Sequence, residues 1–140
     1  MRNIETVAVV GGDLRAAYLA GALAADGYKV ITSGLDSTDL APCVTGCTHP
    51  AQAIFLADCV VLPMPVSTDG GTLNAPFSRT RITLDQVFNA VKVSQFLVGG
   101  AVTDPVKKEA EERGLVIRDY LEREELAILN SIPVALSVMQ

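Results

Sequence analysis

Short apolar runs of strand length alternate with helical patterns from the first residues of this chain, and this alternation constrains the fold more than any other feature. Strands that alternate with helices form repeated βα units, which build a mainly parallel sheet covered by helices. The inner strands of such a sheet are buried on both faces, which explains their unbroken apolar runs. The sequence therefore predicts an α/β fold with a doubly wound, mainly parallel sheet of five strands, at residues 7–10, 29–32, 58–62, 95–99 and 115–117.

Residues that typically start or end a helix lie between these strand-like runs. A residue such as Asp13 caps a helix N-terminus, and a glycine such as Gly27 ends one. Residues 34–49 are rich in Asp, Ser, Thr, Gly and Pro, which predicts a loop. Helices are expected to start at Asp13, Pro50, Thr83 or Asp85, Thr103 and Asp119, the last running to Asn130.

The segment from Pro63 to Ser78 is longer than a βα connection requires, and loops of that length are often functional. It follows the third predicted strand. In open α/β sheets, ligands bind outside the carboxyl ends of the strands. We therefore expect a ligand site at that edge.

Composition narrows the class of protein. The 140 residues suit one domain, and no apolar run approaches the roughly 18 residues of a membrane span. The start of the chain leads directly into a strand, so we expect a cytoplasmic protein with no membrane partner. The net charge is −5 and the basic residues are scattered, which argues against a nucleic acid partner. Three cysteines without a secretion signal indicate reduced thiols.

The turn Gly11-Gly12 after the first strand does not match a dinucleotide-binding fingerprint. The G-x-G-x-x-G spacing is absent, because the next glycine is Gly21. Asp13 also stands where a helix N-terminus would receive a phosphate, and its carboxylate would repel the anion. The turn is therefore not predicted to bind a nucleotide.

Asp13 and Arg15 each have two interpretations. Asp13 is either a helix cap alone or part of a site. An arginine in the first turn of a helix is disfavoured by the helix dipole, so Arg15 is either a solvated surface charge or a partner for Asp13 or a substrate carboxylate.

Several stretches resemble the N-terminal domain of the A-subunit of dipicolinate synthase. The similarity covers nearly the whole chain, and the last stretch is the most specific. The residues that carry it are 11–15 (GGDLR), 62–67 (LPMPVS) with Asp69-Gly70, 76–78 (PFS) and 119–133 (DYLEREELAILNSIP).

The resemblance implies a flavodoxin-like domain related to the substrate-side domains of formate/glycerate dehydrogenases. It also implies an NADP-linked oxidation of a dihydrodipicolinate-type precursor to dipicolinate during sporulation. The B-subunit of dipicolinate synthase is the implied partner and a small dicarboxylate the implied substrate, and a homo-oligomer is left open. NADP is implied for a full-length protein. Residues 1–140 are expected to form a single domain without the NADP-binding domain, so no cofactor site is expected in them.

The chain departs from the family pattern after the 119–133 stretch. Where the family continues into Thr-x-Glu-Gly-Ala, this chain has Val134-Ala135-Leu136-Ser137-Val138. The chain is then either a shortened and altered piece or a stand-alone relative, and we expect it to be inactive alone.

A dianionic substrate needs a cation with paired hydrogen-bond donors. Arg15 is the leading candidate, and Arg79 and Arg81 are either further ligands or surface charges. Neutral donors are also candidates for substrate binding, although such residues build turns and helix ends by themselves. They are Ser67, Thr68 and Asn74 in the long loop, and Asn130 and Ser131, which the family resemblance places at an interdomain cleft.

Other chemistry has weaker support. Cys43-x-x-x-Cys47-x-His49 contains zinc-ligand types, but it offers three ligands and no standard spacing, so no metal is predicted. No catalytic acid–base pair is evident. Two functions therefore stay open: the substrate-side domain of an NADP-dependent dipicolinate synthase, and a non-catalytic interaction or assembly module.

Overall fold

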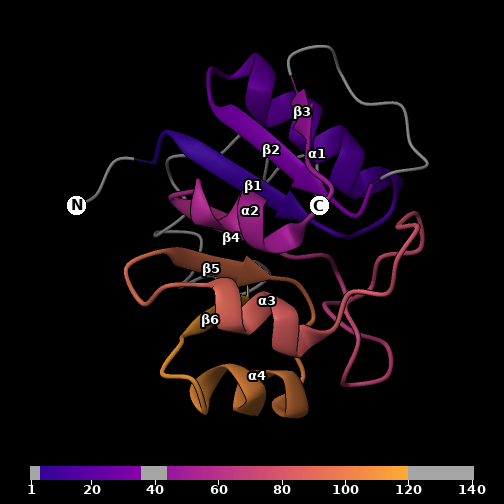
Figure 1. The fold of residues 1–140 in the computed structure, drawn as a ribbon, viewed down its shortest axis with the longest axis vertical. Coiled ribbons are helices and arrows are strands. Elements are labelled where there is room, and N and C mark those ends of the chain that lie inside the picture. The colour runs from indigo at the N-terminus through magenta and orange to yellow at the C-terminus, as the bar shows by residue number, and fades with distance from the viewer. Residues whose placement is uncertain (1–3, 36–43, 120–140) are drawn as a thin grey trace.

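The computed structural model describes residues 4–35 and 44–119, which form one parallel sheet with helices on both faces (Figure 1). The strand order is β3-β2-β1-β4-β5-β6, and every pairing is parallel. The strands are β1 (Thr6–Val10), β2 (Lys29–Ser33), β3 (Val44–Gly46), β4 (Cys59–Val61), β5 (Phe96–Gly99) and β6 (Ile117–Asp119). The helices are α1 (Leu14–Ala25), α2 (Pro50–Phe55), α3 (Leu84–Ala90) and α4 (Asp104–Glu111).

The doubly wound α/β class is confirmed, but the predicted number of five strands is wrong. The sixth strand, β3, lies inside the segment 34–49 that was expected to be a loop. It has three residues and pairs only with β2, and Val44 alone is buried. A short edge strand needs no apolar run, so the sequence pattern did not reveal it. The other five strands keep the flavodoxin-like order 2-1-3-4-5.

The last strand also starts later than predicted. Leu115 is buried, and its backbone N–H donates to Ala110, which makes Leu115 part of the turn that closes α4. Val116 is exposed, and β6 begins at Ile117. The predicted helix over 119–130 lies outside the described residues beyond Asp119.

The predicted helix starts are confirmed within the described residues. Asp13 caps α1 by accepting from the backbone N–H of Arg15. Thr83 and Gln86 form a capping box at α3. Proline occupies the first turn of α2 and of α4, where its missing N–H costs nothing.

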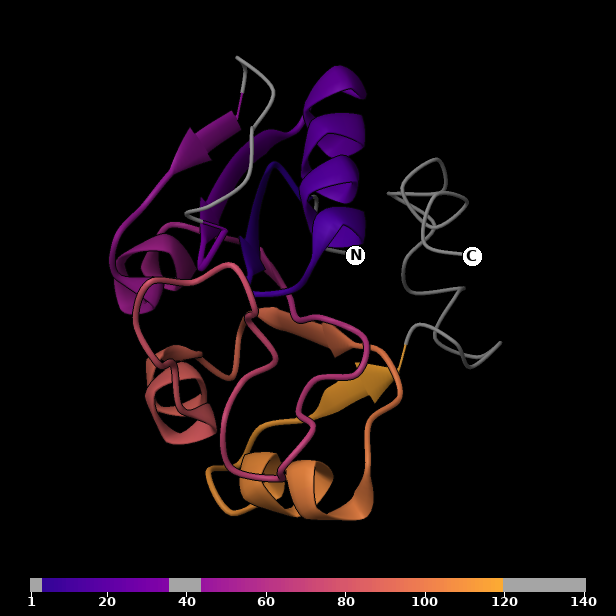
Figure 2. The same ribbon diagram turned by 90° about the vertical axis from the view of Figure 1, so that its right-hand side faces the viewer.

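Two apolar layers hold the helices against the sheet. Figure 2 shows α1 on one face and α2, α3 and α4 on the other. The layer under α1 includes Leu19, Leu23 and alternate residues of β1 and β4, and the layer under the other three helices includes Phe88. Both faces of the central strands are therefore buried, as a doubly wound sheet requires.

The segment between β4 and α3 is fixed along the carboxyl edge of the sheet (Figure 2). Backbone hydrogen bonds join Leu73 to Ile82 and Asn74 to Val66, at 2.8 and 2.9 Å. Ser67 closes the turn inside this segment, because its hydroxyl lies 2.6 Å from the Thr72 carbonyl oxygen. The segment thus forms one wall beside the end of β1.

Candidate functional site

The two glycine amides in the turn between β1 and α1 are not free to bind a phosphate. The N–H of Gly11 donates to the Ser33 carbonyl at 2.7 Å, and the N–H of Gly12 donates to the Asn74 carbonyl at 2.8 Å. Phosphate sites at such turns depend on unpaired N–H groups directed at the anion. These two glycine amides are therefore not available to the pyrophosphate of NADP.

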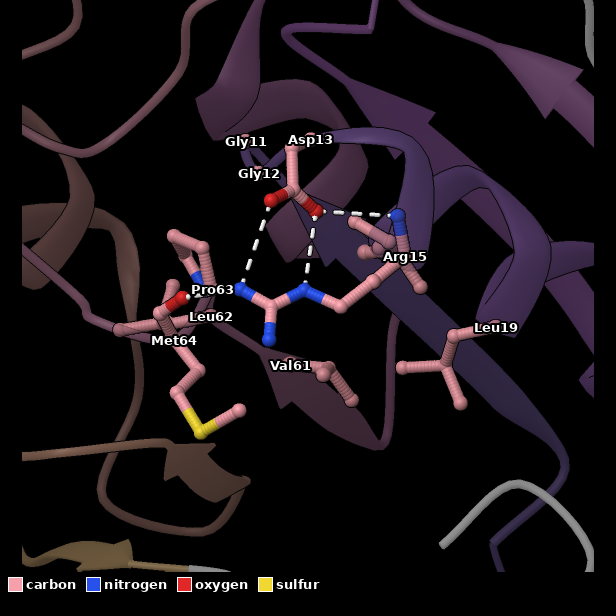
Figure 3. Close-up of a pocket in the computed structure, with 11 residues that line it drawn as sticks. Gly11, Gly12, Asp13, Arg15, Leu19, Val61, Leu62, Pro63 and Met64 are labelled. Atoms are coloured by element: carbon pink, nitrogen blue, oxygen red, sulfur yellow. Dashed lines mark hydrogen bonds and ion pairs between the residues drawn. The ribbon is translucent and has the colours of Figure 1, made fainter. Parts of the chain in front are cut away.

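Asp13 and Arg15 form an ion pair at the start of α1. The two carboxylate oxygens of Asp13 each lie 3.4 Å from one guanidinium nitrogen, Oδ1 from Nε and Oδ2 from Nη2. Nη2 also donates to the carbonyl oxygen of Met64 at 2.9 Å. Figure 3 shows the guanidinium held between Asp13 on one side and Met64 on the other. The pair thus joins the end of β1 to the segment that follows β4.

One side of the guanidinium is left for a ligand. Within the part of the chain that the structure describes, Nη1 of Arg15 has no hydrogen-bond partner, and the side chain is 49% exposed. In Figure 3 this nitrogen points away from Asp13. Its two N–H groups are suited to a carboxylate oxygen, because charge-assisted hydrogen bonds of this kind are short and strong.

The cavity beside Arg15 is small. It has a volume of about 10 Å³ and is lined by the glycine turn, the first turns of α1, and residues 61–64. That volume is close to the room for a single water molecule. The cavity is therefore too small to enclose a dicarboxylate.

Asp13 stays ionised well into the acid range. Partial burial raises the pKa of its carboxyl group, but the hydrogen bonds from the backbone and side chain of Arg15 outweigh this effect and the pKa lies below its usual value. The carboxylate therefore holds the guanidinium in place and is not suited to act as an acid at neutral pH.

The position of this site in the sheet and a comparison with known sequences both indicate what kind of protein this is. β1 and β4 are neighbours at which the winding of the sheet reverses, the usual ligand position in such folds. Residues 6–121 match the family of the N-terminal domain of the dipicolinate synthase A-subunit. The chain belongs to this family.

Solved structures show the same fold as this member of the dipicolinate synthase A-subunit N-terminal domain family. The A chain of dipicolinate synthase from Bacillus subtilis superposes with a TM-score of 0.72 at 22% identity, covering 96% of this chain and 46% of that one. The A-subunit from Bacillus halodurans gives 0.71 at 22% identity, covering 93% and 45%. A diketoreductase gives 0.52 at 13% identity, covering 79% and 47%. The chain thus spans about half the length of the two dipicolinate synthase structures. No curated protein matches the sequence.

The polar residues predicted to bind substrate, Ser67, Thr68 and Asn74, lie in the segment between β4 and α3. They do not line the cavity beside Arg15. Ser67 is buried. Its hydroxyl accepts from the backbone N–H of Gly70 and donates to the carbonyl oxygen of Thr72. The Asn74 amide donates to the Pro65 carbonyl at 3.1 Å. Thr68 is exposed. Ser67 and Asn74 thus hold the loop together, as the turn interpretation allowed.

The other predicted cations lie apart from Arg15. Arg81 is exposed, and its Nε and Nη2 donate to the Thr72 hydroxyl at 3.1 and 2.8 Å. Arg79 is exposed in the same segment and does not line the cavity. Asn130 and Ser131 lie outside the described residues, so their place at the site of this family stays a prediction.

The sequence missed one contact of the site, the carbonyl oxygen of Met64. Every residue type carries a backbone carbonyl, so composition gives no signal for it. The only available signal was the run Pro63-Met64-Pro65, in which two prolines restrict the backbone around the carbonyl.

The cysteines give no sign of metal chemistry in residues 4–35 and 44–119, where no group of three or more ligating side chains is found. The Cys47 thiol lies 3.4 Å from the His49 carbonyl oxygen. Burial raises the pKa of the Cys59 thiol to about 12, so it stays protonated. Cys43 lies outside the described residues.

None of the helices in the described part of the chain combines the length and the hydropathy that a membrane span requires.

Asp69 in the same segment gives a testable pH dependence. Hydrogen bonds from the N–H groups of Gly71 and Thr72 hold the pKa of its carboxyl group well below its usual value. A group with a lowered folded pKa stabilises the fold above its unfolded pKa of about 4 and loses that effect as the pH falls. The urea midpoint of the wild type should therefore exceed that of Asp69→Asn at pH 7, and the difference should shrink below about pH 4. Equal midpoints at both pH values would contradict this assignment.

Proposed function

We propose that this chain is the substrate-side domain of an NADP-dependent dipicolinate synthase and binds the dianionic pyridine-2,6-dicarboxylate or its dihydro precursor. The proposal rests on family membership together with the half-exposed guanidinium of Arg15 at the carboxyl edge of the sheet. A carboxylate of the ligand would accept from Nη1 of Arg15, and Asp13 and Met64 would hold the guanidinium in position.

In this proposal the NADP site belongs to another part of the protein. The precursor would lose a hydride to NADP⁺ and a proton to solvent, which leaves the aromatic pyridine ring. The glycine turn supports this division, because its amides already donate to Ser33 and Asn74. The small cavity beside Arg15 agrees with it, since a ligand at its mouth leaves one side for a second domain. Assembly with the B-subunit of the synthase, the role in sporulation and the cytoplasmic location are further parts of the proposal and follow from the family alone.

A titration tests the proposed substrate contact. We expect dipicolinate to bind the chain with heat measurable by calorimetry, and Arg15→Ala to weaken binding roughly 10- to 100-fold, because a hydrogen bond to a charged group contributes about 1.5–3 kcal/mol. Arg15→Lys should be intermediate, since it keeps the charge but loses the planar fork.

The matched control is Arg81→Ala, which removes the same charge from an exposed side chain whose guanidinium donates to the Thr72 hydroxyl, away from the cavity. It should bind dipicolinate like the wild type. Thermal melting of each variant separates a binding defect from a folding defect. Identical isotherms for wild type and a folded Arg15→Ala variant would overturn the substrate contact.

A further inference from the structure

The turn that follows β5 is bonded to the same segment that holds Arg15. The backbone N–H of Gly100 donates to the carbonyl oxygen of Pro63 at 3.3 Å. The next carbonyl of that segment, which belongs to Met64, accepts from Nη2 of Arg15 at 2.9 Å. The strands end on the right in Figure 1, the side that faces the viewer in Figure 2. Two consecutive carbonyls after β4 are therefore bonded to the β5 turn and to the guanidinium.

The β5 turn is fixed at both of its ends. A Cβ added at Gly99 would lie 2.6 Å from Cγ2 of the buried Val66, so the close approach of the turn to the segment requires glycine. At the other end, the backbone N–H of Val102 donates to Oδ2 of Asp119 at 3.0 Å. The turn is thus held against the segment on one side and against the end of β6 on the other.

Ala101 lies between these two anchors in a conformation that alanine rarely adopts. Its φ is +49°, the only positive φ of a residue other than glycine among the described residues. Such strain persists where the surrounding contacts impose it, and it is concentrated at functional sites. Ala101 is exposed, and its backbone N–H has no hydrogen-bond partner within residues 4–35 and 44–119. The turn therefore holds an unpaired N–H in a fixed position at the carboxyl edge.

Two carboxylates near the turn limit what it can bind. Asp119 accepts from Val102, and Asp104 is exposed in the first turn of α4. Their negative charge disfavours a free dianion such as phosphate at the turn. One carboxylate of a ligand that Arg15 already holds is a better fit, because the guanidinium supplies the positive charge and the N–H donates one hydrogen bond.

We propose that the N–H of Ala101 binds the second carboxylate of the dicarboxylate, while Arg15 binds the first. This inference rests on the proposed function and extends it, because Arg15 accounts for only one end of the ligand. Neighbouring strands lie about 4.8 Å apart, so the guanidinium at the end of β4 and the turn of β5 are separated by about one strand spacing. The two carboxylates of pyridine-2,6-dicarboxylate flank the ring nitrogen and can bridge such a spacing. The turn would thus make the site specific for dicarboxylates over monocarboxylates.

Calorimetric titrations with dipicolinate and with pyridine-2-carboxylate, which lacks the second carboxylate, test the proposal. The wild type should bind dipicolinate about tenfold more tightly, because the smaller ligand loses one hydrogen bond to a charged group. Ala101→Asp adds a carboxylate at the turn, and its repulsion of the second carboxylate should weaken dipicolinate binding about tenfold. The affinity of this variant for pyridine-2-carboxylate should stay at the wild-type value, so the preference between the two ligands is lost.

Ala101→Asn is the matched control, because it adds a side chain of the same size without the charge. Asparagine and aspartate both tolerate a positive φ better than other side chains, so both variants should fold, which urea denaturation checks. Ala101→Asn should keep the wild-type preference for dipicolinate. If neither variant folds, the NMR signal of the Ala101 amide in the wild type decides. It should shift with dipicolinate and stay unmoved with pyridine-2-carboxylate.

Four results would overturn the contact at Ala101: an unchanged preference in a folded Ala101→Asp variant, an equal loss in Ala101→Asn, equal affinity of the wild type for the two ligands, or an Ala101 amide signal that dipicolinate leaves unmoved. In each case the titration of Arg15→Ala still reports on the proposed function, so the two proposals can fail separately. If the wild type binds neither ligand, both proposals fail.

Discussion

Replacing Gly12 by alanine is expected to lower the free energy of unfolding by about 3 kcal/mol, because two unfavourable effects act at this position. The backbone of Gly12 has a φ of +100°, which strains any residue with a side chain. An added Cβ would also lie 2.5 Å from the Cβ of Ala16, which is fixed to the helix and cannot rotate away. Urea denaturation of Gly12→Ala measures the loss.

Gly27→Ala separates the two effects at Gly12. Gly27 has a nearly identical φ of +102°, but no atom lies within 4 Å of the position of its added Cβ. It should lose only about 1 kcal/mol, the cost of the backbone strain. The difference between the two variants then reports the close approach of α1 to the glycine turn. Equal losses would show that the turn does not pack against Ala16 as described.

Phe88→Ala is expected to lower the free energy of unfolding by about 3–5 kcal/mol, the cost of removing a fully buried aromatic ring. Phe88 is 1% exposed and lies on α3 within the apolar layer beneath α2, α3 and α4. The same substitution at Phe55, which is 64% exposed, should cost less than about 1 kcal/mol, including its contact with Lys92. Urea denaturation measures both, and a comparable loss in both variants would contradict the packing of α3.

Sequence patterns predicted the inner strands and the helix starts because both depend on local signals. A strand buried on both faces requires an apolar run, and Asp13, Thr83 and the helix-starting prolines act within one turn of their own position. β3 escaped prediction because an edge strand of three residues with one buried side chain carries no such signal. The start of β6 was misplaced because buried Leu115 serves the end of α4.

The site was predictable only in part, because some of its contacts join residues that are distant in the sequence. Asp13 and Arg15 are two residues apart, so their pairing could be expected from the sequence. Met64 reaches the same guanidinium from a distant segment through a backbone carbonyl, which no residue type reveals. The bonds from Gly11 to Ser33 and from Gly12 to Asn74 also depend on the fold. The charge of Asp13 argued against a nucleotide at the sequence level, and the structure adds that the amides of Gly11 and Gly12 are already paired.

The central claim is that the turn after β1 offers a guanidinium to carboxylates, while the amides of Gly11 and Gly12 are already paired and are not offered to phosphates. An NMR titration of isotope-labelled chain tests it most directly, by following the backbone amides of Gly11 and Gly12 and the Nε–H signal of Arg15. We predict that dipicolinate shifts the Arg15 signal to saturation, and that NADP leaves the Gly11 and Gly12 amides unchanged. A saturable shift of both glycine amides with NADP, with no response of Arg15 to dipicolinate, would contradict the claim.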